Sequence, residues 1–273
     1  MKNLLRTEWL KLKGYPAFWL LLGICVLSYP GINYISVNIF RTILEKKSMA
    51  GQMVLMFLGD PFAFPEVWRT TAFFSSFFVF IPAVLVIMLI SNEFNFKTHR
   101  QNIIDGWSRK QFMLAKLLDV LLITVLLTFF YSFTAFFIGL VQSGDSPVSP
   151  VRLSYYVLLF ALQTFSQLSL AFLVGLLVRK SFIAMAIFLF YGIILEPAFV
   201  NLFKYKWLKN DIGRFFPMEL SDRLLPPPAF MSNIDQEAYD AMLASVQPHI
   251  GYTILLVVGT WALAFYLFLK RDL

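Results

Sequence analysis

Hydrophobic residues in this chain fall into six long runs, separated by shorter segments that hold most of the polar residues. The runs cover Ala17–Phe40, Thr71–Ser91, Leu117–Val141, Tyr155–Val178, Ser181–Val200 and Tyr252–Leu269. About 20 helical residues cross the ~30 Å hydrocarbon core of a bilayer. The runs lack the ~10-residue alternation of a membrane barrel, and helices are the other structure that can span lipid. The pattern predicts an all-α membrane protein, with six transmembrane helices in one domain over residues 1–273.

Composition agrees with this class and excludes some kinds of site. Hydrophobic residues make up 59% of the chain and charged residues 14%, whereas about a quarter of the residues in soluble domains are charged. The single cysteine, Cys25, cannot form an internal disulfide. Because His99 and His249 are far apart in sequence, a soft-metal site within one chain is not expected.

The distribution of basic residues predicts the orientation. Six spans place both ends of the chain on one side, and the segments on that side carry more than half of the 23 Lys and Arg residues. The two-residue turn Arg179–Lys180 is among them. Short cytoplasmic loops are enriched in Lys and Arg, so both termini are predicted to be cytoplasmic. The net charge of +7 is then a topology signal, and no other feature suggests nucleic-acid binding.

Two segments outside the spans have helical patterns. In residues 1–14, Leu5, Trp9 and Leu12 share one helical face and basic residues line its flank, which favours an amphipathic helix at the membrane interface; the alternative is a charged tail. Residues 201–251 are predicted to be a partly helical external segment. Its Pro-rich stretch is followed by a helix that Asn233 would cap and Pro248 would end.

The most polar cytoplasmic segment, Ser91–Lys116, contains an acid that requires a partner. Glu93 follows the second hydrophobic run, at a helix end where the dipole disfavours negative charge. Lys97, Arg100 and Arg109 are the basic residues that we expect to compensate it. Nearer the third run, Asp119 follows Lys116 by three residues, which predicts a local ion pair.

The same segment has the boundaries of a short helix. Thr98 is predicted to cap a helix through Asp105, Gly106 to close it, and Ser108 to cap the next helix, which continues into the third span. The resulting protrusion, made rigid by ion pairs, would let a partner move two membrane helices together. The alternative is an ordinary solvated loop.

No constellation for covalent or metal catalysis is present. The chain has no G-x-x-x-x-G-K-[ST], G-x-S-x-G or H-E-x-x-H motif. We therefore expect no enzymatic activity in this chain, and in particular no ATP hydrolysis of the P-loop kind.

The pattern Glu93-x-x-x-Lys97-Thr98, Gly106-x-Ser108-Arg109 and Lys116 resembles the cytoplasmic motif of ABC-2 type transporter permeases. That family shows an acid, a Gly-Thr pair, a Pro/Gly-x-Ser-Arg turn and a following Lys between its second and third spans. Lys97 stands where the family usually has Gly. The N-terminal amphipathic segment, the six runs and the external segment before the last run are also similar to the family.

The resemblance implies a function and its partners. Two permease chains, identical or related, would pair around a pathway in the bacterial cytoplasmic (inner) membrane and act as an exporter. Each would bind a separate ABC ATPase subunit that holds ATP and Mg, while this chain binds no cofactor. The contact would be a coupling helix, Thr98–Asp105. The implied ATPase-coupling interface comprises Glu93, Lys97, Thr98, His99, Arg100, Asp105, Gly106, Ser108 and Arg109.

Polar residues within the runs are further candidates, because burying them in lipid is costly. Gln163 and Gln167 lie one helical turn apart, with Tyr156 further back on a similar face. They either line the pathway or partner interface, or make ordinary hydrogen bonds between helices. Glu196, beside Pro197 near the end of the fifth run, either contacts substrate or forms a structural ion pair.

Two other functions remain open on the sequence alone. An ion-coupled secondary transporter would show acids near the membrane midplane and internal repeats, and Glu196 is the one acid that fits. A non-transporting membrane anchor or sensor of an ATPase complex would look much like a permease.

Overall fold

The computed structural model describes residues 2–45, 60–144, 149–204, 211–228 and 236–270, and in these ranges all regular structure is helical. By length and composition, five helices can cross a membrane, and a bent helix pair raises the number to six. The prediction of an all-helical protein is confirmed. The candidate spans are α2 (Pro16–Glu45), α4 (Val67–Ser76) with α5 (Phe80–Asn95), α7 (Arg109–Ser143), α8 (Tyr156–Val178), α9 (Ser181–Phe190) with η1 (Tyr191–Leu195) and α10 (Glu196–Leu202), and α12 (Gln236–Lys270).

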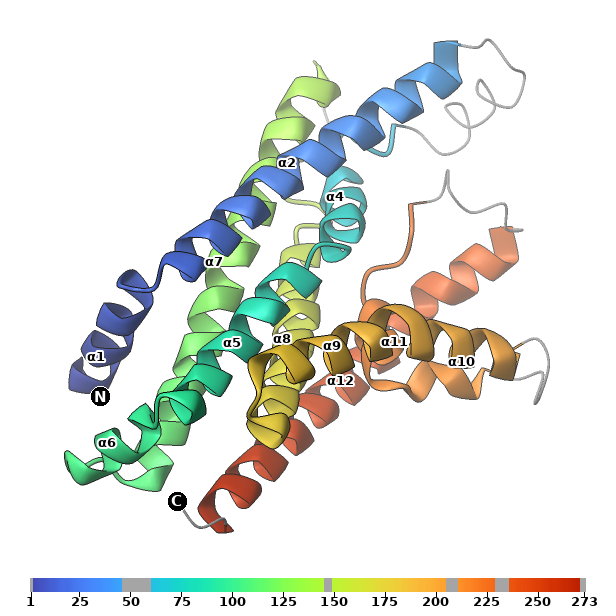
Figure 1. Ribbon diagram of the computed structural model, residues 1–273. Coiled ribbons are helices and arrows are strands. Elements are labelled where there is room, and N and C mark those ends of the chain that lie inside the picture. Colours follow the sequence, from blue (N-terminus) through green and yellow to red (C-terminus); the bar gives the residue numbers. More distant parts are fainter. Residues whose placement is uncertain (1, 46–59, 145–148, 205–210, 229–235, 271–273) are drawn as a thin grey trace.

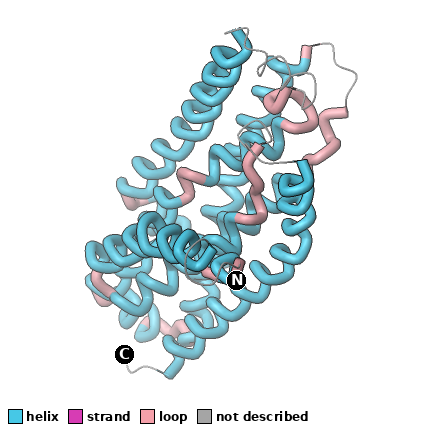
Figure 2. The backbone as a smooth tube through the Cα atoms, turned by 90° about the vertical axis from the view of Figure 1, so that its right-hand side faces the viewer, coloured by secondary structure: helices cyan, strands magenta, loops and turns pink. Residues whose placement is uncertain are grey.

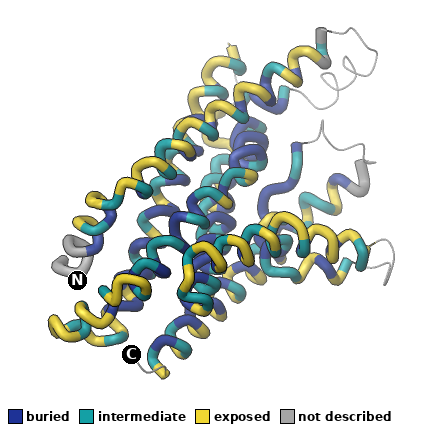
Figure 3. Tube along the Cα trace, viewed as in Figure 1, coloured by how far each residue is buried: buried dark blue, intermediate teal, exposed yellow. Residues whose placement is uncertain are grey.

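Helix α8 lies at the centre of the bundle and packs against α4, α5, α7, α9, α11 and α12. Aromatic side chains fill the core around it: Tyr131 stacks on Phe160 with ring centroids 4.3 Å apart, and Phe172 stacks on Trp261 at 4.8 Å. The outer faces of α2 and α9 are largely exposed (Figure 3). Apolar residues on those faces suit contact with lipid or with another membrane helix.

The second span is bent. The run Thr71–Ser91 was expected to be one helix, but the structure has α4 and α5 with an angle of 50° between them. Pro82 explains where α5 begins, because proline has no amide hydrogen to donate and fits the first turn of a helix. The bend therefore follows from a residue inside the hydrophobic run.

The last span is longer than predicted. Pro248 was expected to end a separate external helix, but α12 continues through it from Gln236 to Lys270. Tyr239 and Val246, on the part before Pro248, are buried, and the hydroxyl of Tyr239 donates to the carbonyl of Pro227 at 3.4 Å. This packing holds the chain in a helix on both sides of the proline, which costs one backbone hydrogen bond.

The predicted external segment does not lie wholly beyond the ends of the spans. After α10 the chain forms η3 (Ile212–Phe215) and α11 (Pro217–Asp222), and α11 packs against both α8 and α12. Leu224 and Leu225, just after α11, are fully buried. The chain thus returns into the bundle before α12, and we call residues 211–228 the return segment. The predicted cap at Asn233 lies outside the described residues.

Three segments that are far apart in sequence lie toward the same end of the bundle: α1 (Lys2–Lys13), α6 (Thr98–Ile104) and the end of α12 (Figure 1; Figure 2 shows the bundle turned by 90°). Helix α1 packs on α7, and α6 packs on α5 and α7. The guanidinium of Arg109 donates to the carbonyl of Leu269 at 2.9 Å, where a cation also suits the negative end of the α12 dipole.

Close contact between α5 and α8 depends on Gly175. A Cβ atom at this position would lie 2.5 Å from Cγ2 of Ile90 and 3.3 Å from Cα of Ile87. We expect Gly175→Leu to lower the free energy of unfolding by about 1–3 kcal/mol, because the two helices must separate. Gly259→Leu, on α12 where nothing lies within 4 Å, is the matched control. Thermal unfolding in detergent measures both, and equal stability of the two variants would contradict the packing.

Candidate functional site

The polar segment between α5 and α7 forms a compact corner. Helix α5 ends at Asn95, and Lys97 takes a left-handed backbone conformation with φ 55°. Helix α6 then runs from Thr98 to Ile104, and Gly106, with φ 100°, turns the chain toward α7. Glycine adopts positive φ without the clash that other residues have. Lys97, which stands where the resembling family usually has Gly, therefore has a strained backbone conformation that glycine would adopt without strain.

Two predicted caps have different outcomes. The hydroxyl of Ser108 accepts a hydrogen bond from the amide of Gln111, whose side chain accepts one from the amide of Ser108. This capping box confirms the predicted start of α7. The prediction that Thr98 caps α6 was wrong: Thr98 is the first residue of the helix, and its hydroxyl donates instead to the carboxylate of Glu93.

The carboxylate of Glu93 belongs to a cluster of five charged side chains, four of which are buried. Its members are Glu8 and Lys11 of α1, Glu93 of α5, and Lys116 and Asp119 of α7. We call this group the lysine–carboxylate cluster. The ammonium of Lys116 lies 2.5 Å from Glu8, 2.8 Å from Glu93 and 3.3 Å from Asp119. Lys11 lies 3.1 Å from both Glu8 and Glu93.

The cluster corrects one prediction and confirms another. Lys97, Arg100 and Arg109 were expected to compensate Glu93, but Lys11 and Lys116 do so. The predicted pair of Lys116 with Asp119 is present. The contributions of α1 were missed, because contacts between residues so far apart in sequence leave no local pattern. The available signal was Glu8, the one acid in a basic N-terminal segment.

Burial makes this cluster sensitive to the loss of any member. The side chains of Glu8, Glu93, Lys116 and Asp119 are at most 8% exposed. For Glu8, burial alone would raise the pKa, but the ammonium groups of Lys116 and Lys11 outweigh it and hold the pKa below its ordinary value. The cluster thus joins α1, α5 and α7 through contacts between lysine and carboxyl side chains.

Helix α6 is fixed at its base and exposed on its outer face. Nδ1 of His99 lies 2.7 Å from the carbonyl of Glu93, and the His99 ring contacts Phe94 at 4.7 Å. By contrast, Arg100 and Asp105 are exposed, and Ile104 is 77% exposed. Of the predicted interface residues, therefore, Glu93, Thr98 and His99 hold the corner together, while Arg100 and Asp105 face outward beside Ile104.

The glutamines of α8 meet an acid that sequence reasoning did not select. Nε2 of Gln163 and Nε2 of Gln167 donate to the same oxygen of Asp222 on α11, at 3.0 and 2.7 Å. Asp222 and Gln167 also line a cavity of about 210 Å³. Tyr156 lies elsewhere, stacked on Tyr155 at 4.7 Å. The end of the return segment thus reaches the predicted polar face of α8.

Glu196 connects the fifth span to the same return segment. The amide of Glu219, in the first turn of α11, donates to its carboxylate at 2.6 Å. A carboxylate at a helix N-terminus satisfies amide groups that have no partner within the helix. The expected structural ion pair is replaced by this hydrogen bond in the described residues. The π-helical turn Tyr191–Leu195 precedes Pro197, and both π-helical turns and prolines are sites at which helices bend.

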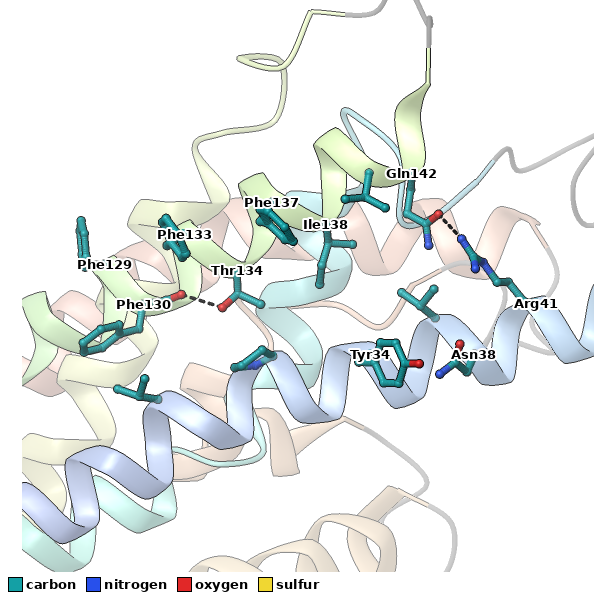
Figure 4. A pocket seen from close by; sticks show the side chains of 14 residues that line it. Tyr34, Asn38, Arg41, Phe129, Phe130, Phe133, Thr134, Phe137, Ile138 and Gln142 are labelled. Carbon is teal, nitrogen blue, oxygen red and sulfur yellow. Dashed lines mark hydrogen bonds between the residues drawn. The ribbon is translucent and has the colours of Figure 1, made fainter.

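A second hollow lies between α2 and α7. It has a volume of about 640 Å³ and is lined mainly by apolar side chains. Figure 4 shows Phe133 and Phe137 of α7 facing Tyr34 and Asn38 of α2 across it. At one end, the guanidinium of Arg41 donates to Gln142 at 2.7 Å. None of the predicted site residues lines this groove. Among the described residues, no group of three or more His, Cys, Asp or Glu side chains could hold a metal ion.

The cluster predicts a specific stability effect. Lys116→Met leaves three buried carboxylates against one ammonium, and we expect it to lower the free energy of unfolding by about 3–5 kcal/mol. Adding Asp119→Asn should recover part of this loss, because it removes a buried carboxyl group that has lost its lysine partner. Lys180→Met, at an exposed lysine, is the control and should change stability by less than about 0.5 kcal/mol. Thermal unfolding measures all three; a neutral Lys116→Met would show that the cluster does not hold the helices together.

Comparison with known proteins identifies the family. The sequence model described as ABC-2 family transporter protein matches residues 4–195, which include most of α1, the corner around α6 and every member of the lysine–carboxylate cluster. No curated protein matches the chain. The match covers well over half of the 273 residues, and the chain therefore belongs to the ABC-2 family of transporter proteins.

Proposed function

We propose that this chain is the permease subunit of an ATP-driven ABC-2 exporter, and that α6 is the coupling helix that docks on a separate ABC ATPase subunit. The proposal depends mainly on the structure of the corner. The outer face of α6 is exposed, and its base is joined through Glu93 to α1, α5 and α7. Exposed apolar side chains among charged ones mark protein–protein contacts. Ile104 and Phe96, 77% and 74% exposed, are such residues.

The corner can transmit a push from the ATPase to the membrane helices. Thr98 and His99 both bind Glu93, through its carboxylate and its carbonyl. Glu93 shares Lys116 with Glu8. Movement of α6 would therefore displace α5, α7 and α1 together, because separating them would expose uncompensated buried charges. ATP and Mg would remain on the ATPase subunit.

The orientation and assembly follow from the same proposal. The end of the bundle that carries α1, α6 and the last turn of α12 would face the cytoplasm, in agreement with the basic residues gathered there. Two permease chains, identical or related, would enclose the pathway in a bacterial cytoplasmic membrane. Helix α1, with its Trp9 exposed, would lie at the membrane interface.

Two competing functions are separated by measurements on the complex. An anchor or sensor would bind the ATPase, but no substrate would stimulate ATP hydrolysis in the reconstituted complex. A secondary transporter would purify without an ATPase and move its substrate in response to an ion gradient. The exposed face of α6 favours the permease, since a secondary transporter has no need of a docking helix.

The docking face predicts the outcome of a co-purification experiment. Tagged protein purified from native membranes in mild detergent should carry a P-loop ATPase. Ile104→Asp and Arg100→Glu should reduce its yield at least about tenfold, because a charge is placed on, or reversed at, the proposed contact. Lys180→Glu makes the same charge change at the exposed α8–α9 turn and should leave the yield unchanged.

The contrary results are distinct. If no ATPase accompanies the wild-type protein, the permease proposal fails as a whole. If an ATPase accompanies both α6 variants in normal yield, the subunit docks elsewhere and α6 is not its contact. Thermal unfolding of each variant shows that the loss of yield does not come from loss of fold.

A further inference from the structure

The cavity beside Asp222 lies where three parts of the chain converge. Phe73, Phe77 and Phe80 come from the bend between α4 and α5, Phe188 from α9, and Asp222 from α11. The rest of its wall is also mostly apolar, apart from Ser76 and Gln167. Phe77, Phe80 and Ile193 are 57%, 40% and 60% exposed, so the cavity opens on the side of the bundle.

The carboxylate of Asp222 has neutral partners. One of its oxygens accepts both hydrogen bonds, from Gln163 and Gln167. Its neighbour Arg223 binds Asp211 and Glu219. Among the ion pairs of the described residues, none involves Asp222. In the lysine–carboxylate cluster, by contrast, each carboxylate has an ammonium group as a partner.

Asp222 is exposed at this mostly apolar cavity, and a carboxylate that lacks a counter-ion beside apolar walls attracts a cation more strongly than one surrounded by water on all sides. The surrounding wall selects the kind of cation. Metal ions such as Mg²⁺ and Ca²⁺ require several oxygen ligands, whereas aromatic rings attract organic ammonium groups through their negative faces. A cavity of about 210 Å³ with several phenylalanines and one carboxylate therefore suits an ammonium group attached to an apolar body.

We propose that this cavity binds the ammonium group of an amphipathic organic cation, with Asp222 as its counter-ion and the phenylalanines as its walls. Gln163 and Gln167 orient the carboxylate from α8. The inference deepens the proposed transport function by naming a substrate class, and it rests on that function only for the step of transport. The family match ends at residue 195, so Asp222 lies beyond the matched region.

Binding can be measured on the full chain without an ATPase. The probe is radiolabelled benzyltrimethylammonium, whose charge does not depend on pH, added to protein in phosphatidylglycerol nanodiscs. We expect saturable binding to the wild type and an affinity at least about tenfold lower for Asp222→Asn. Asp240→Asn, the same substitution at an exposed position on α12 outside the cavity, should bind like the wild type. Neutral benzyl alcohol should not displace the probe.

A second variant keeps the test valid if Asp222→Asn is poorly folded. Gly192 lines the wall of the cavity, where an added Cβ would meet only the side chain of Met218, at 3.4 Å. Gly192→Leu should therefore fill the space and reduce binding while it leaves the carboxylate in place. Equal binding by the wild type and a folded Asp222→Asn, or displacement by benzyl alcohol, would overturn the proposal.

Lipid composition distinguishes two sources of the ammonium group. If phosphatidylethanolamine added to the nanodiscs displaces the probe, a lipid headgroup occupies the cavity; if it does not, the natural ligand is a soluble cation. Either result is compatible with the site. If the α6 variants lose the ATPase but still bind the probe, the proposed cation site is unaffected. If the ATPase docks normally but the wild type does not bind the probe, the cation site is wrong and the docking proposal is unaffected.

Discussion

The arrangement of helices at the α6 end of the bundle depends on the contacts of the Lys116 ammonium group. This group lies 5% exposed among three carboxylates that come from α1, α5 and α7. A buried ammonium contributes little net stability compared with apolar packing, but its partners cannot leave it without a large cost. It therefore acts mainly on geometry: it specifies which helices lie together, and it makes them move as one unit.

The bundle contains two acidic sites that differ in the partners of their carboxylates: one is largely buried, and the other is exposed beside a cavity. At the α6 end, Glu8, Glu93 and Asp119 have two ammonium partners within the chain. In the return segment, Asp222 accepts hydrogen bonds from two side-chain amides and forms no ion pair with another described residue. A cluster in which every carboxylate contacts an ammonium group of the chain suits a permanent joint, because it has no need of another ligand. A carboxylate in an open cavity that lacks a cationic partner suits a site that binds and releases a ligand. We therefore associate the lysine–carboxylate cluster with the transmission of force and Asp222 with the recognition of a ligand.

The sequence predicted those features that depend on contacts between residues close together in the chain. The hydrophobic runs indicated the spans, and Ser108 marked the start of α7 because its cap is a contact with the next turn. What could not be predicted were contacts between residues far apart in sequence. The partners of Glu93 come from positions 82 residues before it and 23 after it, and Asp222 reaches α8 across more than 50 residues. The prediction that Pro248 ends a helix was wrong for the same reason, because the packing of Tyr239 and Val246 outweighs the tendency of a proline to end a helix.

The bend between α4 and α5 has a mechanical consequence. In a straight span, an axial displacement at one end appears unchanged at the other. With 50° between the two halves, part of any axial thrust on α5 becomes a sideways load on α4, and a twist of α5 about its own axis swings α4 through an arc. The two faces of the membrane thus need not respond in the same direction to a single stroke. A joint of this kind lets one half of the span close while the other opens.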